Sequence, residues 1–395
     1  MKIQSLTARP VLDSRGQWTV EVSLALANGV RAVASVPQGK STGASEAVAL
    51  PAPVAVRRIE NIIAPKLKRT QIHSQAALDA FLNKLDGTKT KKKLGANAIL
   101  ATSVAYLRAT AVANNIPLWK QIRKEYGVPV RASADVAHPR LFVNVVNGGL
   151  HAGNDLDFQE YLIIPRVKTI KESVEIATEV YRALGGALAA AKGKTATSIG
   201  DEGGYAPNFK DDLEPFHILH GVVKKLKLER KVDFGMDAAA TDIKKSQQED
   251  LGKIYTQLIH RYGLVYLEDP FGEEEFEKFA MLTALFGKKM WIAGDDLTTT
   301  NVRRMERAHA ERSVNGVIVK PNQIGSVTEA LDAVRAARKY GWAVVASHRS
   351  GETNDDFIAD FAYGVGADGL KLGAPARGER IAKYNRLLEI EQKES

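Results

Sequence analysis

The sequence predicts an α/β protein in which a C-terminal β/α barrel follows a smaller N-terminal α+β domain. Three observations lead to this fold class. The 395 residues are enough for one barrel and a companion domain. The first part alternates apolar and polar residues as antiparallel strands do, and the second part repeats a strand-like run followed by a helical stretch. Hydrophobic residues make up 45% and charged residues 26%, which is typical of a globular protein.

The chain begins with three predicted strands. Two alternating runs, WTVEVSLAL at 18–26 and VRAVASV at 30–36, flank a turn that contains Asn28 and Gly29. Asn-Gly between alternating hydrophobic residues is a strong hairpin signal. We therefore expect residues 2–36 to form a three-stranded meander.

Helices and a linker follow the predicted meander. From residue 54 to about residue 126 apolar residues recur at i, i+3 and i+4, which predicts helices. The segment RASADVAHPR at 131–140 is polar, contains proline and has no periodicity, so we interpret it as a linker. The expected division is an α+β domain at 1–135 and a barrel domain at 136–395.

The barrel is expected to begin with two strands and two helices. The apolar runs at 141–146 and 158–165 are close enough in sequence to pair as a hairpin, so the order begins ββ rather than βα. Two helical stretches, at about 170–192 and 213–227, come before the next strand-like run. The expected order is therefore ββαα followed by βα units.

Six later strand-like runs each stop at a functional side chain. Successive strand ends are separated by 31, 27, 25, 28 and 23 residues, an interval that suits one strand and one returning helix. In a β/α barrel such strand ends meet at the C-terminal face, where the active site lies. The six strand-end residues are Asp237, Glu268, Asp295, Lys320, His348 and Lys371.

Composition excludes several classes of site. The chain has no cysteine, so a metal would have to bind oxygen or imidazole ligands. No stretch resembles a signal peptide or reaches the roughly 18 apolar residues of a membrane span, so we expect a cytoplasmic protein. Lys and Arg exceed Asp and Glu by 55 − 46 = 9, but the excess lies in short, scattered clusters. Without a basic stripe interleaved with aromatics, specific nucleic-acid binding is not expected.

Three carboxylates, Asp237, Glu268 and Asp295, end what should be neighbouring strands. Three unpaired anions at one point would repel one another, and a hard cation with oxygen ligands would relieve the repulsion. The all-oxygen set favours Mg²⁺. The alternative, that each carboxylate pairs with a nearby Lys or Arg, is preferable for one Asp alone but not for three in barrel register.

The next strand ends are basic: Lys320, then His348, Arg349 and Ser350, then Lys371. A mouth that binds metal on one arc and is basic on the other suits a substrate with a carboxylate and a phosphate. There a lysine could remove the proton beside a metal-held carboxylate. We expect the metal and Lys371 to lower the pKa of Lys320 toward that of a working base.

Two glycine-rich loops complete the candidate site: NGGLHAGNDLDFQE at 147–160 and GDEGGYAP at 200–207. Glycines let these loops turn tightly and would bring His151, Glu160 and Glu202 into the cavity. Taken alone, either loop could equally be an ordinary turn of a generic α/β enzyme.

The order of these motifs resembles the enolase family along nearly the whole chain. The matching stretches are LDSRGQWTVEV, VPQGKSTGASEA, LDGTKTKKKLGANAIL, VNGGLHAGNDLDFQE, GDEGGYAPN, LEDPF, GDDLTTTN, KPNQIG, SHRSGETNDDFIAD and KLGAPARGERIAKYNRLLEIE. The resemblance implies a cytoplasmic glycolytic lyase that interconverts 2-phosphoglycerate and phosphoenolpyruvate. It also implies two Mg²⁺ ions per site and a homodimer or higher homo-oligomer.

The resemblance also implies a role for each site residue. Lys320 would be the base, Glu202 the acid and Glu160 its supporting partner. Ser41, in a mobile loop at 37–46, would ligate the second Mg²⁺ together with the substrate phosphate. The ligands of the first Mg²⁺ would be Asp237, Glu268 and Asp295. The substrate would be held by His151, Glu160, His348, Arg349, Ser350 and Lys371.

The chain departs from the family pattern in several loops. After Glu46 it reads AVALPAPVAV where the family commonly has an Arg-Asp-Gly-Asp stretch, and the loop after Asp237 is shorter. Gln38 and Lys40 stand where Ser and Ala are more usual, and Pro321 follows the predicted base where Val is common. These departures bear on loop kinetics and subunit contacts, and none removes a catalytic group.

Two other functions are possible for this sequence pattern. One is an acid-sugar lyase or racemase of the same superfamily, which would not be expected to carry GGLHAGN, GDEGG and SHRSGET together. The other is a non-catalytic binding protein on the same fold, which would not need a complete set of catalytic side chains.

Overall fold

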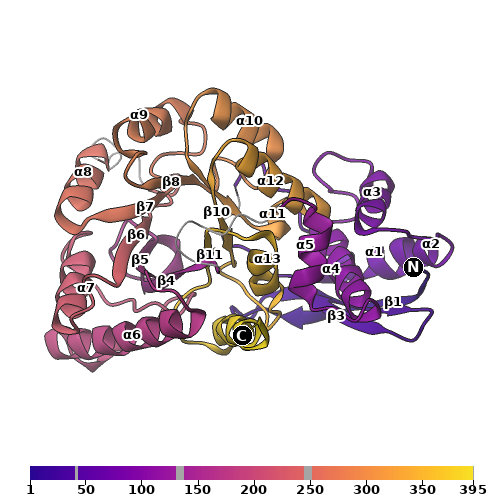
Figure 1. The fold of residues 1–395 in the computed structure, drawn as a ribbon, viewed down its shortest axis with the longest axis horizontal. Helices are drawn as coiled ribbons and strands as arrows, with labels where there is room; N and C mark the ends of the chain where they lie inside the picture. Colours follow the sequence, from indigo (N-terminus) through magenta and orange to yellow (C-terminus); the bar gives the residue numbers. More distant parts are fainter. Residues whose placement is uncertain (41–42, 130–137, 244–250, 395) are drawn as a thin grey trace.

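The computed structural model describes residues 1–40, 43–129, 138–243 and 251–394 and contains a barrel beside a smaller N-terminal part (Figure 1). The N-terminal sheet has the antiparallel order β1-β2-β3. Its strands are β1 (Ile3–Leu12), β2 (Trp18–Leu26) and β3 (Arg31–Ser35). The predicted meander is confirmed, and the turn glycine Gly29 has the left-handed φ of +88° that favours glycine there.

Helices cover one face of this sheet. Residues 52–68 run through α1, a π-helical turn and α2 without leaving helical geometry. Ser74 caps the next helix, α3, by accepting a hydrogen bond from the backbone N–H of Ala77. The helices are α1 (Ala52–Arg58), the π turn (Ile59–Ile63), α2 (Ala64–Lys68), α3 (Gln75–Asp86), α4 (Ala96–Ala113) and α5 (Leu118–Tyr126).

Helix α4 is the core helix of the N-terminal part. It packs against β2 and β3, where Val20, Val22 and Leu24 are fully buried. By length and composition alone it could cross a membrane, but 78% of it is buried inside the protein. Packing of α4 in the core of the N-terminal part accounts for its apolar sequence.

Eight strands close into a barrel in the order β10-β11-β4-β5-β6-β7-β8-β9. Strand β5 is antiparallel to both β4 and β6, and the other neighbours are parallel. The expected ββ beginning is therefore confirmed. The strands are β4 (Arg140–Asn147), β5 (Glu160–Pro165), β6 (Val232–Asp237), β7 (Leu264–Glu268), β8 (Trp291–Gly294), β9 (Gly316–Val319), β10 (Ala343–Ser347) and β11 (Gly369–Lys371).

Helices surround the barrel (Figure 1), and the interior of the barrel is filled by a cluster of apolar side chains. The interior cluster contains Phe142, Tyr266 and Ile318, so the barrel is a packed core and its site must lie at the mouth. Two helices separate β5 from β6, as expected. The helices are α6 (Ile170–Lys192), α7 (Glu214–Lys225), α8 (Leu251–Tyr262), α9 (Phe276–Phe286), α10 (Val302–Ala310), α11 (Pro321–Ile324), α12 (Val327–Lys339), α13 (Phe357–Val365) and α14 (Gly378–Glu394).

The N-terminal part is held to the barrel beside its mouth. Helix α5 packs on α13. Arg108 of α4 donates two hydrogen bonds to Asp355, at 2.6 and 2.8 Å, and Asp355 also accepts one from the backbone N–H of Ser35 at 3.0 Å. These contacts place the segment after β3 over the strand ends. The expected domain boundary near residue 135 lies outside the described residues.

Candidate active site

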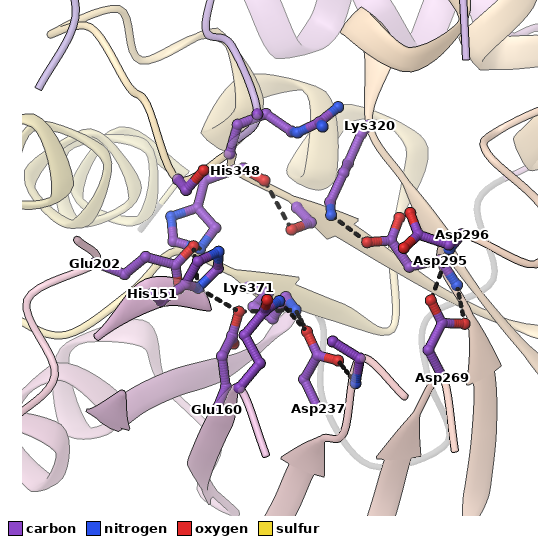
Figure 2. Close-up of a pocket in the computed structure, with 16 residues that line it drawn as sticks. His151, Glu160, Glu202, Asp237, Asp269, Asp295, Asp296, Lys320, His348 and Lys371 are labelled. Carbon is purple, nitrogen blue, oxygen red and sulfur yellow. Dashed lines mark hydrogen bonds and ion pairs between the residues drawn. The ribbon is translucent and has the colours of Figure 1, made fainter. Parts of the chain in front are cut away.

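A cavity opens at the carboxyl ends of the barrel strands, and Figure 2 shows the side chains that line it. Ten of the residues singled out in the sequence lie around it. Glu268 lies just beneath, with no exposed surface, and Ser41 is outside the described residues. The ten are His151, Glu160, Glu202, Asp237, Asp295, Lys320, His348, Arg349, Ser350 and Lys371.

Two lysines pair with the three predicted metal carboxylates. The Nζ atom of Lys371 lies 3.0 Å from Asp237 Oδ2 and 2.8 Å from Glu268 Oε1. The Nζ atom of Lys320 contacts Asp295 Oδ2 (Figure 2). In this structure each predicted ligand thus has a cationic partner, which is the alternative weighed from the sequence.

The carboxylates at this side of the mouth still crowd one another. Burial, followed by the charge of Asp237, raises the pKa of Glu268 to about 8. Burial and the charge of Asp295 likewise raise the pKa of Asp296 to about 8. One oxygen of each of Asp269, Asp295 and Asp296 lies within 4.8 Å of the others. Such an all-oxygen set fits a hard divalent cation such as Mg²⁺.

Asp269 and Asp296 were not predicted as site residues. Asp269 holds a left-handed φ of +40°, and its two carboxylate oxygens accept hydrogen bonds from the backbone N–H groups of Asp295 and Asp296 at 2.9 and 2.7 Å. Asp269 therefore fixes the backbone of Asp295 and Asp296, directly after the end of β8. The available signal was that Asp269 and Asp296 directly follow predicted ligands in LEDP and GDD.

Lys320 follows β9 and points toward the acidic arc. Its backbone N–H donates to Thr300 Oγ1 at 2.9 Å. Burial is the largest single effect and lowers the pKa of Lys320, but the charge of Asp295, with that of Glu268, opposes it, and the net pKa is raised. The prediction of a lowered pKa is therefore wrong for this structure. It considered Lys371 and a metal but not the direct ion pair with Asp295.

Glu160 and Glu202 form an unequal pair on the opposite side of the cavity. Glu202 Oε2 accepts a hydrogen bond from Asn144 at 2.9 Å, and its Oε1 lies 3.5 Å from the ring nitrogens His151 Nδ1 and His348 Nε2. Burial raises the pKa of Glu202, but His348, His151 and Arg380 together lower it more, to well below its usual value. Burial and then the charge of Glu202 raise the pKa of Glu160 well above its usual value. Glu160 therefore binds a proton more readily than Glu202 does.

The segments after β3 and β10 meet across the mouth. Gln38 and Gly351 exchange backbone hydrogen bonds at 2.8 and 3.0 Å, and Ser350 Oγ accepts one from the backbone N–H of Lys40 at 2.8 Å. Arg349 donates to both carboxylate oxygens of Glu46, each at 3.0 Å. Glu46 was quoted in a motif but not predicted as a site residue.

Other contributors also escaped prediction. Gln323 donates to Asp295 Oδ1 at 2.8 Å, Asn144 binds Glu202, and Arg380 contacts His348 Nδ1 at 2.6 Å. Asn144 could have been found as a polar residue in an apolar strand run. Gln323 and Arg380 gave no such local signal, because each lies inside a helix far from its partner in sequence.

Comparison with known proteins agrees with this architecture. The family model "Enolase, N-terminal domain" matches residues 3–122, and "Enolase, C-terminal TIM barrel domain" matches residues 136–395. This chain is 41% identical to each of three enolases, those of Solanum lycopersicum, Methanopyrus kandleri and Methanocaldococcus jannaschii. Each alignment covers 99% of this chain and 95 or 96% of the relative. The order of motifs, the closed barrel with its ββ beginning and these matches agree, and the chain belongs to the enolase family.

Proposed function

We propose that the side chains at this barrel mouth carry out the reaction of the enolase family, the reversible Mg²⁺-dependent dehydration of 2-phosphoglycerate to phosphoenolpyruvate. The chain is a phosphopyruvate hydratase that acts on a small molecule. The observation that carries the assignment of roles is the placement of Lys320 on one side of the cavity and the Glu160–Glu202 pair on the other, with carboxylates between them (Figure 2).

Asp237, Glu268, Asp295 and Ser41 would hold the two Mg²⁺ ions. Removal of a proton beside an ionised carboxylate produces a dianion, and bound Mg²⁺ supplies positive charge that stabilises it. The raised pKa values of Glu268 and Asp296 support the assignment, since burial and then repulsion from a neighbouring carboxylate cause them, and a bound cation would offset both.

Lys320 would take the proton from C2 of the substrate. Only the neutral amine can act as a base, and the contact with Asp295 favours the ammonium form. That contact must therefore weaken before the proton is taken. The position of Lys320 after β9 and its burial support its role as the base, because a buried amine without its carboxylate partner has a lowered pKa.

Glu202 and Glu160 would supply the proton that the 3-hydroxyl needs in order to leave. The pKa of Glu160 is raised and that of Glu202 is lowered, so a proton held by the pair would favour Glu160, and His151 Nδ1 lies 3.5 Å from Glu202 and 4.0 Å from Glu160. This preference supports the role of Glu160 as the partner of Glu202. Movement of that proton toward Glu202 would restore the acid for the next turnover.

The remaining polar residues of the mouth would hold the substrate. Arg349 offers a planar donor fork and Ser350 a hydroxyl, a combination suited to a phosphate group. The others in this role would be His151, Glu160, His348 and Lys371. Arg349 now binds Glu46, so substrate binding would exchange one anion for another at its guanidinium.

Three further features belong to this proposal. The chain would divide into two domains at residue 135, and a mobile active-site loop at 37–46 would close over the mouth and exclude water. We also propose a homodimer or a higher homo-oligomer, and a cytoplasmic enzyme. Specific nucleic-acid binding is not part of the proposed function.

A coupled assay tests the proposed reaction. Phosphoenolpyruvate formation from 2-phosphoglycerate should require Mg²⁺ and should exceed any turnover of a panel of acid sugars. Turnover of an acid sugar in preference to 2-phosphoglycerate would overturn the substrate assignment.

A further inference from the structure

Arg380 is a fully buried arginine whose main partners are not carboxylates. It lies near the start of α14 with 0% of its surface exposed. Its guanidinium lies 2.6 Å from His348 Nδ1 and donates to the backbone carbonyls of Arg349 and Ser350, each at 2.6 Å. In the described residues its one ion pair within 4.0 Å is with Glu379, 3.5 Å from Nε. Most of its short contacts are therefore with His348 and with backbone carbonyls.

The contact with His348 determines which ring nitrogen carries the proton. A guanidinium has five donors, has no acceptor and does not lose its proton in proteins. His348 Nδ1 must therefore be the acceptor. A neutral imidazole has one acceptor and one donor nitrogen, so the hydrogen is on Nε2, which lies 3.5 Å from Glu202 Oε1.

We propose that Arg380 is a positioning residue that fixes His348 in its Nε2–H tautomer and so presents a hydrogen-bond donor to Glu202 and to the reacting end of the cavity. The catalytic meaning rests on the proposed function, but the tautomer itself does not. The opposite tautomer would place two donors together at Nδ1 and a lone pair against the Glu202 carboxylate. Both contacts would be repulsive.

Arg380 also fixes the relative position of the two residues. Through the carbonyls of Arg349 and Ser350 it holds the segment that carries His348. Through a 3.2 Å hydrogen bond to the carbonyl of Asp201 it holds the residue before Glu202. One side chain thus sets the tautomer of the donor and ties down the acceptor. His151 Nδ1 and His348 Nε2 both lie 3.5 Å from Glu202 Oε1 and neither has a closer hydrogen-bond partner in the described residues, but only His348 has its other nitrogen, Nδ1, held by a guanidinium.

The charge state of His348 agrees with this arrangement. Burial lowers the pKa of His348 to about 3, with a contribution from Arg380 and against the opposing charge of Glu202. The ring is therefore neutral near pH 7 and acts as a fixed donor. An imidazolium would carry a second hydrogen at Nδ1, facing the guanidinium.

Nitrogen NMR of the ring tests the tautomer directly. The protein has 8 histidines, so labelling only histidine with ¹⁵N gives a simple spectrum, and His348→Gln identifies the signals of His348. In the wild-type protein without substrate, Nδ1 should give the signal of an unprotonated nitrogen and Nε2 that of a protonated one. In Arg380→Met the two signals should move toward each other as both tautomers become populated. A protonated Nδ1 in the wild type would overturn the proposal.

Arg377 provides a matched control. It lies three residues earlier and also donates to backbone carbonyls, those of Ser14 at 2.7 Å and Gly200 at 3.3 Å. No contact with His348 is present among the described residues. Arg377→Met should therefore leave the His348 signals unchanged. If it moves them as much as Arg380→Met does, the effect is general loosening and the proposal fails.

Activity provides a second readout. Arg380→Met should lower kcat by about 10- to 100-fold, the usual effect of losing a group that orients a functional imidazole, with a smaller change in KM. Arg380→Lys should recover part of the loss, and His348→Gln, whose amide can place an N–H near Nε2, should be more active than His348→Leu. Equal activity of the two His348 variants would contradict the donor role.

The two proposals can fail separately. If Arg380→Met does not fold, the wild-type spectrum still decides the tautomer. A protein with the Nε2–H tautomer but no 2-phosphoglycerate turnover would refute the proposed reaction and leave this inference standing.

Discussion

The ammonium of Lys371 lies 2.8 Å from the carboxylate of Glu268, and both residues are at least 99% buried. The same ammonium also contacts Asp237 and Glu160, at 3.0 and 3.2 Å. One cation from β11 therefore holds three carboxylates from neighbouring strands. Removal of one partner of a buried ion pair leaves uncompensated charge, which is costly.

Lys371→Met should therefore destabilise the protein by about 3–5 kcal/mol in urea unfolding without Mg²⁺. Addition of Mg²⁺ should restore much of the loss, since a ligand that binds only the folded state adds stability. The control is Lys393→Met, which removes an exposed pair with Glu389 and should change stability by less than about 1 kcal/mol. Equal effects of the two substitutions would contradict the role given to Lys371.

Removal of metal should abolish activity. EDTA should stop phosphoenolpyruvate formation and Mg²⁺ should restore it, because the acidic arc serves to hold the metal. Asp295→Asn should weaken Mg²⁺ binding, measured by calorimetry, more than it disturbs folding, although it also leaves the buried Lys320 without its charged partner. The control Asp332→Asn alters an exposed residue of α12 and should leave Mg²⁺ affinity unchanged. Full activity in metal-free buffer would refute the metal assignment.

Asp79 predicts a specific pH dependence of stability. It is buried between α3 and the start of α12, where its Oδ2 accepts hydrogen bonds from the backbone N–H and the hydroxyl of Thr328, at 2.9 and 2.6 Å. Burial raises the pKa of Asp79 above 3.8, although these hydrogen bonds and one from Ser103 oppose the shift. The folded state therefore binds the proton more tightly than the unfolded state. The resulting stability is present below pH 3.8 and is lost as the pH rises through the folded-state pKa.

Asp79→Asn removes this titration. Its free energy of unfolding relative to the wild type should therefore rise between pH 4.5 and pH 7.5, by roughly 1 kcal/mol for each unit of the pKa shift. Urea unfolding at the two pH values measures the change, with Asp332→Asn as the exposed control. A difference that falls with pH would mean that the hydrogen bonds, not burial, dominate at this carboxyl.

The fold was predictable because its signals are local. Six of the barrel strands are short apolar runs followed at once by a charged residue or a histidine, and each interval of 23 to 31 residues between them fits one returning helix. Strand ends such as Asp237 and Lys371 could be placed at one mouth because parallel strands in a barrel all end on the same face. Short turns between alternating runs, such as the turn that contains Gly29, predicted the antiparallel pairing of the N-terminal strands.

The partners within the site were not predictable in the same way. Arg349 and Glu46 are 303 residues apart, and Arg380 meets His348 from a helix that follows another strand. No periodicity links such residues, since their contact depends on how two finished elements pack. The raised pKa of Lys320 was missed for this reason, because the ion pair with Asp295 across two strands was not foreseen.

The basic charge predicts weak binding to nucleic acid. Many cations of the N-terminal part, such as Arg57, Lys66 and Lys92, are exposed at the ends of elements or in loops. Binding through phosphate contacts alone falls steeply with salt, so RNA affinity should be largely lost between about 50 and 200 mM salt. Filter binding of a mixed-sequence RNA across this range provides the measurement. Tight RNA binding at the higher salt would indicate a specific nucleic-acid site and would contradict the interpretation that the basic residues are dispersed over the surface.

The last prediction separates the two halves of the reaction, since the base and the acid stand on different barrel elements. Lys320→Ala leaves no group to take the C2 proton. Dehydration and exchange of that proton with deuterated solvent should therefore collapse together. Glu202→Gln should behave differently. Lys320 and the carboxylates remain, so the C2 proton can still leave and return, while the 3-hydroxyl lacks its proton donor.

Exchange should therefore persist in Glu202→Gln, measured by NMR of recovered 2-phosphoglycerate, while phosphoenolpyruvate formation falls by about 10²–10⁴-fold, the usual contribution of a general acid. Glu160→Gln offers a comparison, because the raised pKa of Glu160 favours its neutral form and the amide of the variant is also neutral. It should lower dehydration less than Glu202→Gln does. If Glu202→Gln loses exchange as completely as Lys320→Ala, the base and the acid are not separate groups, and the assignment of Lys320 to the first half and Glu202 to the second is wrong.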